Sequence, residues 1–243
     1  METKKILLVG CGEIGSRHLQ ALAKIEFPTE IWVIDPSLDS LKVGKERFEQ
    51  NPTNQNIKSI QFKEKFPESL HGLDLSIIST TSKTRYSIFK DITEKTTCKN
   101  FILEKIVFPD KELFYDANEI CLKKGIKCWV NNYRREEQYW KDIRSLFADK
   151  GNFELFYGNA DWHLCTNIIH ILDLITWLSN EKISKIDGTK LNKKIFKSKR
   201  SGFLELTGTI TGVTSNKGSF KLESVEDIPY DQVEFTISND MIK

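Results

Sequence analysis

Apolar positions in the first half of the chain alternate between two spacings. Short runs of consecutive apolar residues, such as residues 6–9, are separated by stretches with apolar residues every three or four positions. Strands that are apolar on both faces and alternate with helices are typical of a parallel sheet covered by helices on both sides. The pattern predicts strands near 4–9, 30–34, 58–62, 74–79, 100–105 and 127–132, with helices near 15–25, 38–50, 84–96 and 111–124.

The pattern changes after about residue 134. Two amphipathic or apolar helices are expected at 136–147 and 167–178, and a strand near 153–157. Three later segments alternate apolar and polar residues, which is typical of antiparallel strands with one face in water; they lie at 203–210, 218–223 and 232–237. We therefore expect an α/β fold with two domains: a doubly wound parallel sheet in residues 1–133 and a shortened α+β domain with an antiparallel sheet in residues 134–243.

A glycine-rich turn connects the first predicted strand to the first predicted helix. Gly10, Gly12 and Gly15 have G-x-G-x-x-G spacing, and Asp35 ends the second strand, 20 residues beyond Gly15. Such glycines allow a tight turn, close approach of a pyrophosphate and close helix packing, while the helix N-terminus attracts the phosphates. The context predicts a Rossmann-type dinucleotide-binding domain. The expected cofactor contacts in this turn are Gly10, Gly12, Glu13, Ile14 and Gly15. A glycine turn without a ligand is the alternative.

Asp35 is the residue that determines whether NAD or NADP is preferred. Its carboxylate can accept hydrogen bonds from both ribose hydroxyls and would repel a 2′-phosphate. Pro36 and Ser37 follow it, so no neighbouring arginine is available to attract that phosphate. NAD is therefore favoured over NADP.

Polar residues follow three further strands of the predicted sheet. In an open parallel sheet ligands bind at the carboxyl ends of the strands, so these residues are candidates for the cofactor and substrate site. They are Ser79, Thr80, Thr81 and Ser82 at the end of the fourth strand, Glu104 and Lys105 at the end of the fifth, and Asn131, Asn132, Tyr133, Arg134 and Arg135 at the end of the sixth. For Glu104 and Lys105, an ion pair at the end of a strand is an equal alternative.

His170 and Asp173 interrupt an otherwise apolar helix of the second domain. Their i, i+3 spacing places them on one helix face, where a histidine and a carboxylate can tune each other's pKa and relay a proton. A core histidine that is satisfied by a neighbour on the same helix is the alternative, and from the spacing alone it is preferred.

Composition narrows the class of protein. The 36 basic and 34 acidic residues give a net charge of +2, which provides no field for binding nucleic acid. The chain has no run of the ~20 apolar residues that a membrane span needs and no signal-peptide pattern. The five cysteines lack C-x-x-C spacing, so we expect reduced thiols, no metal site and a cytoplasmic location. Cys11 lies near a helix N-terminus that could lower its pKa, although a small residue tolerated in the turn is the simpler interpretation.

Four of these motifs together resemble the glucose–fructose oxidoreductase / inositol dehydrogenase / MocA family. They are residues 10–19 including His18, Glu104-Lys105 with Ile106 where the family motif has proline, Tyr133-Arg134-Arg135, and His170-x-x-Asp173. The resemblance extends from Lys5 to about Ile237. Within the family, residues 162–174 are most similar to a branch associated with bacterial surface-polysaccharide and nucleotide-sugar pathways.

The resemblance implies roles for the candidate residues. Lys105 would contact the substrate hydroxyl near the nicotinamide, His170 would be the main acid/base, and Asp173 would bind or orient the substrate. Glu104 would support Lys105 or the nicotinamide end, and Tyr133 and Arg135 would contact the substrate. The implied activity is NAD-dependent hydride transfer between the nicotinamide and a hydroxyl or ketone carbon of a sugar, nucleotide sugar or polyol. A homodimer or homotetramer through the second-domain sheet is also implied.

Two alternatives follow from the sequence. One is a reductase of another C=O or C=N group. The other is a non-catalytic NAD(H)-binding relative, because 243 residues are fewer than is usual in that family. The presence of Lys105, His170 and Asp173 favours the enzyme. The sequence leaves the substrate, the direction of reaction and the oligomeric state open.

Overall fold

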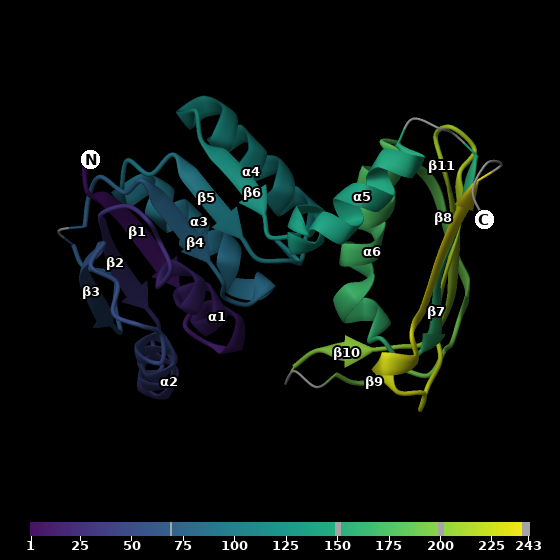
Figure 1. Cartoon of the computed structure of the whole chain (residues 1–243), viewed down its shortest axis with the longest axis horizontal. Coiled ribbons are helices and arrows are strands. Elements are labelled where there is room, and N and C mark those ends of the chain that lie inside the picture. Colours follow the sequence, from purple (N-terminus) through teal and green to yellow (C-terminus); the bar gives the residue numbers. More distant parts are fainter. Residues whose placement is uncertain (69, 149–151, 199–201, 240–243) are drawn as a thin grey trace. The chain divides into compact units, whose positions relative to one another are not determined.

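The chain folds into two compact units, Met1–Asn131 and Asn132–Lys243, in a computed structural model that describes residues 1–68, 70–148, 152–198 and 202–239 (Figure 1). The division lies two residues before the boundary expected from the sequence. Each unit has its own sheet and its own hydrophobic core.

The first unit is built on a six-stranded parallel sheet with strand order β3-β2-β1-β4-β5-β6. Its strands are β1 (Lys4–Val9), β2 (Thr29–Ile34), β3 (Ile57–Lys63), β4 (Leu75–Ile78), β5 (Asn100–Leu103) and β6 (Lys127–Val130). Its helices are α1 (Glu13–Leu22), α2 (Leu38–Glu49), α3 (Ser82–Lys95) and α4 (Lys111–Lys124). Strand order reverses between β1 and β4, which is where a doubly wound sheet binds its ligands. The predicted α/β fold class is confirmed.

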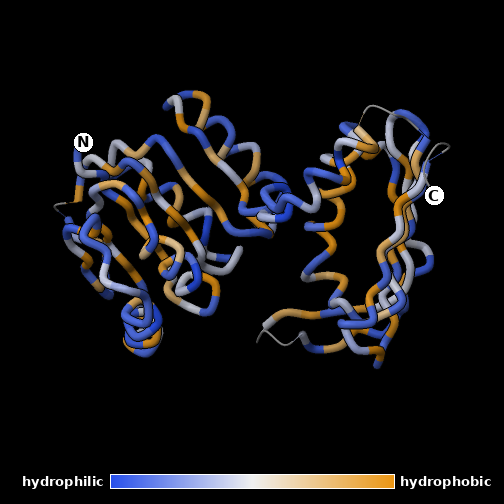
Figure 2. Tube along the Cα trace, in the orientation of Figure 1, coloured by the Kyte–Doolittle hydropathy of each residue, from blue (hydrophilic) through white to orange (hydrophobic). Residues whose placement is uncertain are grey.

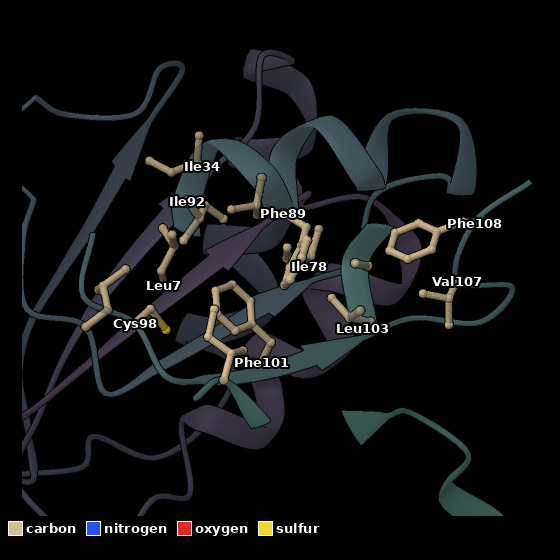
Figure 3. Packing of buried hydrophobic residues seen from close by; sticks show 14 of the residues in the cluster. Leu7, Ile34, Ile78, Phe89, Ile92, Cys98, Phe101, Leu103, Val107 and Phe108 are labelled. Carbon is tan, nitrogen blue, oxygen red and sulfur yellow. The ribbon is translucent and has the colours of Figure 1, made fainter. Parts of the chain in front are cut away.

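Helices cover both faces of this sheet. One face packs against α3 and α4, where Leu7, Ile78, Phe89 and Phe101 gather in one cluster (Figure 3). Hydrophobic residues follow the central strands of the unit (Figure 2). The other face packs against α1 and α2, through a second cluster that includes Ile6, Leu8, Cys11, Leu19, Ile31, Val33 and Leu41. Burial on both faces explains why these strands are runs of apolar residues without polar alternation.

The second unit holds a five-stranded sheet with strand order β13-β7-β12-β11-β8. The elements are η1 (Tyr133–Glu136), α5 (Gln138–Phe147), β7 (Phe153–Ala160), α6 (Leu164–Ser179), β8 (Ile183–Leu191), β11 (Gly208–Thr214), β12 (Ser219–Ser224), η2 (Tyr230–Gln232) and β13 (Glu234–Asn239). A separate two-stranded pair consists of β9 (Phe196–Lys197) and β10 (Leu204–Glu205). The five-stranded sheet is mixed, whereas an antiparallel sheet was expected, because β12 runs parallel to β7.

One face of this sheet packs against α6 and α5. Leu155, Phe220 and Leu222 of the sheet form a core with Ile171 and Ile175 of α6. The alternation of apolar and polar residues in these strands therefore corresponds to one face of the sheet that is buried against the helices. The crossover from β7 to β12 contains α6 as well as β8 and β11, and a connection of that length permits parallel pairing.

Two strand expectations differ from the structure. β8 was not expected, and the strand expected at 203–210 is divided between β10 and β11. β8 lies at the edge of its sheet and most of its residues are exposed, so it lacks the apolar alternation of a half-buried strand. Within the described ranges, no helix combines the length and apolar character needed to cross a membrane.

Candidate functional site

The glycine turn after β1 has three glycines that meet three different demands. Gly10 has a φ of +89°, and a Cβ there would lie 2.9 Å from the backbone nitrogen of Thr80. A Cβ on Gly15 would lie 1.8 Å from the carbonyl oxygen of Gly10, so close packing of α1 on the turn requires glycine. A Cβ on Gly12 would meet no atom within 4 Å. The fold therefore requires the first and last glycines, whereas the space beside Gly12 is open.

The N-terminus of α1 faces the same turn. Its N-cap is Gly12, which has no side chain to accept a hydrogen bond from the first turn of the helix. Such uncapped N–H groups and the helix dipole attract an anion. The Glu13 side chain lies in this turn but is bound by Arg47 at 2.9 Å, and this hydrogen bond is the main cause of its lowered pKa. Arg47 therefore compensates the charge of Glu13.

Asp35 follows β2 and is fixed against the glycine turn. Its Oδ2 accepts a hydrogen bond from the backbone N–H of Cys11 at 2.6 Å, and its Oδ1 accepts one from the N–H of Ser37 at 2.8 Å. Because a carboxylate has about four acceptor positions, these two bonds leave room for ribose hydroxyls. The half-buried carboxylate is thus held beside the turn by the backbone.

The Cys11 thiol is buried beside the glycine turn. It is 1% exposed, and burial, together with the charge of Asp35, raises its pKa to about 11. The sequence left open whether the helix N-terminus lowers this pKa; the pKa is instead raised, and burial is the largest cause. The side chain fills space left by Gly44 of α2 instead: a Cβ on Gly44 would lie 2.1 Å from the Cys11 Sγ.

Arg85 joins the carboxyl ends of β4 and β5. It is only 2% exposed, and its guanidinium donates hydrogen bonds to backbone carbonyls on both sides; the acceptors are Thr80, Glu104, Ile106 and Val107. These bonds hold the segment that carries Lys105, in which the Lys105–Ile106 peptide is cis. Lys105 itself is half-buried. Sequence reasoning missed Arg85, although it shares the buried stripe of α3 with Phe89, Ile92 and Thr93.

Thr80, Thr81 and Ser82 lie at the end of β4, as predicted. Thr81 is the exposed N-cap of α3 and makes no side-chain capping bond, and Ser82 opens the helix. Ser79 belongs to the same predicted cluster, and its hydroxyl donates to the Gly10 carbonyl at 2.6 Å. The end of β4 is therefore attached directly to the glycine turn.

Glu104 lies at the end of β5 and binds two residues with which the sequence predicted no contact. Its Oε1 accepts hydrogen bonds from Nε2 of His18 at 2.7 Å and from Nδ2 of Asn131 at 2.6 Å. Burial favours the neutral acid, but these hydrogen bonds and the charges of His18 and Arg85 lower the pKa of Glu104. The three residues come from α1, β5 and the end of β6, which lie far apart in the sequence and meet only through the strand order.

The second unit brings its candidate residues together around η1 and α6. His170 is 8% exposed, its Nδ1 lies 3.1 Å from Oδ1 of Asn132, and the ring of Tyr133 contacts it edge-on at 5.8 Å. Arg135 binds both carboxylate oxygens of Asp173, with Nε to Oδ2 at 2.7 Å. The spacing of His170 and Asp173 left two interpretations, a mutually tuned pair or a core histidine satisfied by its own helix. In the structure each has a partner on the segment from 132 to 135.

No model of a protein family matches this chain. No curated protein matches it either. Solved structures do match along nearly its whole length. The WlbA dehydrogenase from Chromobacterium violaceum, in complex with NADH and UDP-GlcNAcA, has a TM-score of 0.74 at 16% identity, covering 99% of this chain and 72% of its own.

Two further matches have similar scores. The myo-inositol dehydrogenase from Lactobacillus casei, in complex with NAD(H) and myo-inositol, has a TM-score of 0.70 at 15% identity, covering 97% of this chain and 71% of its own. An oxidoreductase from Agrobacterium radiobacter, in complex with NAD⁺, L-tartaric acid and magnesium, has a TM-score of 0.72 at 15% identity, covering 97% and 72%. The chain therefore has the two-domain fold of these dehydrogenases, which is the fold that the resemblance in its sequence predicted.

Proposed function

We propose that this protein is an NAD-dependent oxidoreductase of the glucose–fructose oxidoreductase / inositol dehydrogenase / MocA family. Its reaction would be hydride transfer between the nicotinamide and a hydroxyl or ketone carbon of a sugar, nucleotide sugar or polyol. The observation that carries the proposal is the open space at Gly12, the N-cap of a helix without a side-chain cap, next to Cys11, whose backbone N–H binds the Asp35 carboxylate. Since the protein itself does not fill this space, the glycine is explained by a ligand whose phosphates approach the backbone.

The residues of the first unit fit NAD. The glycine turn, with Glu13 and Ile14, would hold the pyrophosphate, and Asp35 would accept hydrogen bonds from the adenosine ribose. We assign four residues to the nicotinamide half of the cofactor: Thr80, Thr81, Ser82 and Glu104. Because the Asp35 carboxylate repels a 2′-phosphate, NAD is preferred to NADP. When bound, NAD supplies the acceptor for the hydride.

We assign the remaining residues to proton transfer and to orientation of the substrate. If Nδ1–H of His170 donates to Oδ1 of Asn132, the basic lone pair of the imidazole is on Nε2, and we assign His170 to accept or return the hydroxyl proton through that nitrogen. We assign the same proton transfer to Lys105 as a second group. Arg135 holds Asp173 through two bonds, so we assign Asp173, with Tyr133, to orienting the substrate.

The structures that match this chain guide the choice of substrates. One contains a nucleotide sugar, one myo-inositol and one tartaric acid, all of which carry oxidisable hydroxyl groups. A panel of UDP-, GDP- and CMP-sugars, inositols and hydroxy acids, with NAD⁺, should produce NADH absorbance with at least one member. Lys105→Ala and His170→Ala should lower turnover by about 10²-fold or more while NAD⁺ binding persists.

Protein fluorescence on titration with NAD⁺ and NADP⁺ decides the cofactor assignment. His71→Ala is the matched control for His170→Ala, because His71 is exposed and its Nδ1 lies 3.3 Å from the Lys95 carbonyl oxygen, outside the proposed site. No binding of either nucleotide would refute the proposal. Binding without turnover on any panel member would instead support the non-catalytic alternative.

We also propose association into a homodimer or homotetramer through the outer face of the second sheet. Phe156 and Lys221 lie on this face because their neighbours along the strands are in the core. Lys221 pairs with Glu223 at 2.9 Å and lies over the Phe156 ring. Sedimentation at several protein concentrations, with Lys221→Glu as the disrupting variant, tests the association; a monomer at every concentration would refute it.

A further inference from the structure

A buried, ionised carboxylate lies at the end of β5. Glu104 is 6% exposed, and its Oε1 accepts two hydrogen bonds, from His18 and Asn131. Burial alone would raise the pKa of this carboxyl, yet the two hydrogen bonds and the nearby charges lower it. A buried charge is costly unless it is compensated, and His18 is the partner here that can gain or lose its own charge.

The position of Glu104 relates it to one half of the proposed cofactor. A dinucleotide lies across the carboxyl ends of the strands, on both sides of the point where strand order reverses. Asp35, at the end of β2, belongs to the half that would hold the adenosine ribose. Glu104 and Asn131, at the ends of β5 and β6, belong to the other half, which would receive the nicotinamide. The nicotinamide ring is positively charged when oxidised and neutral when reduced, so a carboxylate on this side favours the oxidised form.

We propose that His18, acting through Glu104, sets the relative affinity of the first unit for NAD⁺ and NADH and makes it dependent on pH. This inference rests on the proposed function and makes His18 a positioning residue. With the imidazole protonated, the Glu104–His18 pair is neutral and discriminates little between the two cofactor forms. Once the imidazole loses its proton, the carboxylate charge acts alone and NAD⁺ gains affinity relative to NADH.

The other charged groups around this pair do not reproduce the effect. Arg85 approaches Glu104 from α3, and α1 itself carries Arg17 and Glu13. Both arginines keep their charge at all relevant pH values, and the pKa of Glu13 is already lowered by Arg47. Histidine is the side chain that ordinarily changes charge between about pH 5 and 8. Lys105 follows Glu104 directly in the chain and is therefore tested by its own variant.

The experiment measures two dissociation constants on the full chain between about pH 5.5 and 8.5, the range in which histidine titrates. NADH is titrated by its own fluorescence and NAD⁺ by displacement of NADH. In the wild type, the ratio of the NADH to the NAD⁺ dissociation constant should rise about three- to tenfold with pH, the effect of one unit charge across several ångströms of partly hydrated site. His18→Gln retains an N–H donor for Glu104 without titrating, so its ratio should stay constant. His71→Gln, the matched control, and Lys105→Gln should both retain the rise.

The possible results separate this inference from the proposed function. A ratio in the wild type that does not change with pH overturns the inference, and so does a full rise in His18→Gln. Loss of the rise in Lys105→Gln, with the rise retained in His18→Gln, assigns the effect to Lys105 and also overturns it. If His18→Gln does not fold, as judged by circular dichroism, His18→Asn replaces it with the same expected result. If the wild type binds neither nucleotide, the proposed function itself fails.

Discussion

Replacing Gly44 with alanine should destabilise the first unit, and removing the sulfur of Cys11 should reverse the sign of that effect. Gly44 lies inside α2, where glycine costs about 1 kcal/mol relative to alanine. A Cβ at this position would lie 2.1 Å from the Sγ of Cys11, and its next contacts would be at 3.8 Å. Since Cys11 is 1% exposed, its sulfur is enclosed and has little freedom to move.

The magnitude follows from two opposing terms. Overpacking a filled core costs typically 1–3 kcal/mol, and a contact this short belongs in the upper part of that range, about 2–3 kcal/mol. The helical preference of alanine offsets about 1 kcal/mol. Gly44→Ala should therefore lower the free energy of unfolding by roughly 1–2 kcal/mol in the wild type and raise it by about 1 kcal/mol in Cys11→Ala. The coupling between the two positions is then about 2–3 kcal/mol.

Hydrogen exchange under urea, read by mass spectrometry on peptides from β1 and α2, measures this coupling within the first unit. A protein with two compact units need not unfold in one step, so a signal averaged over the chain is unsuitable. Lys42→Ala is the matched control because Lys42 lies on the exposed face of the same helix; it should show no coupling to Cys11. Equal destabilisation by Gly44→Ala in both backgrounds would refute the packing argument.

Three further predictions concern the cofactor turn and its surroundings. Asp35→Ala should weaken NAD⁺ binding roughly tenfold or more, the range expected for hydrogen bonds to a charged group, and should relax the preference over NADP⁺; fluorescence titration with both nucleotides checks this, and an unchanged preference would contradict it. Gly12→Ala should leave the stability of the first unit unchanged and weaken NAD⁺ binding, because its Cβ points into open space. Gly15→Ala should lower that stability because its Cβ meets the Gly10 carbonyl. Hydrogen exchange on peptides of the first unit measures both, and equal stability of the two variants would contradict the distinction. The pKa of Glu104 in the folded protein lies below its ordinary value of 4.5, so the stability that the carboxylate contributes is complete above that pH and is lost as the pH falls through the folded pKa. Hydrogen exchange under urea on peptides of the first unit should therefore show a steeper loss of stability under acid conditions in the wild type than in Glu104→Gln, and parallel curves would exclude this contribution.

The strands and helices of the first unit were predictable because their residues carry the information locally. β1 and α4 begin and end at the residues that the apolar pattern predicted. Because the sheet is buried on both faces, its strands are continuous apolar runs whose ends are easy to recognise. β8 could not be predicted in this way: it is an exposed edge strand with a glycine in its interior, and its pairing with β11 comes from the backbone. The parallel pairing of β12 with β7 was equally invisible, because a strand pattern does not reveal direction.

The candidate site residues also differ in how far they could be predicted, depending on whether the information is local in the sequence. The glycine turn and Asp35 are recognisable because one strand, one turn and one helix impose their spacing within a short stretch of chain. The bonds from His18 and Asn131 to Glu104 join residues 86 and 27 positions apart, and only the strand order brings them together. The spacing of His170 and Asp173 located two chemically competent groups but not their partners, Asn132 and Arg135, which lie at the start of the second unit. Sequence spacing thus identifies residues within one element, whereas the charge and tautomer of each depend on a contact from another element. For that reason the His18–Glu104 pair, rather than the glycine turn, is where the structure adds most to the chemistry expected of this chain.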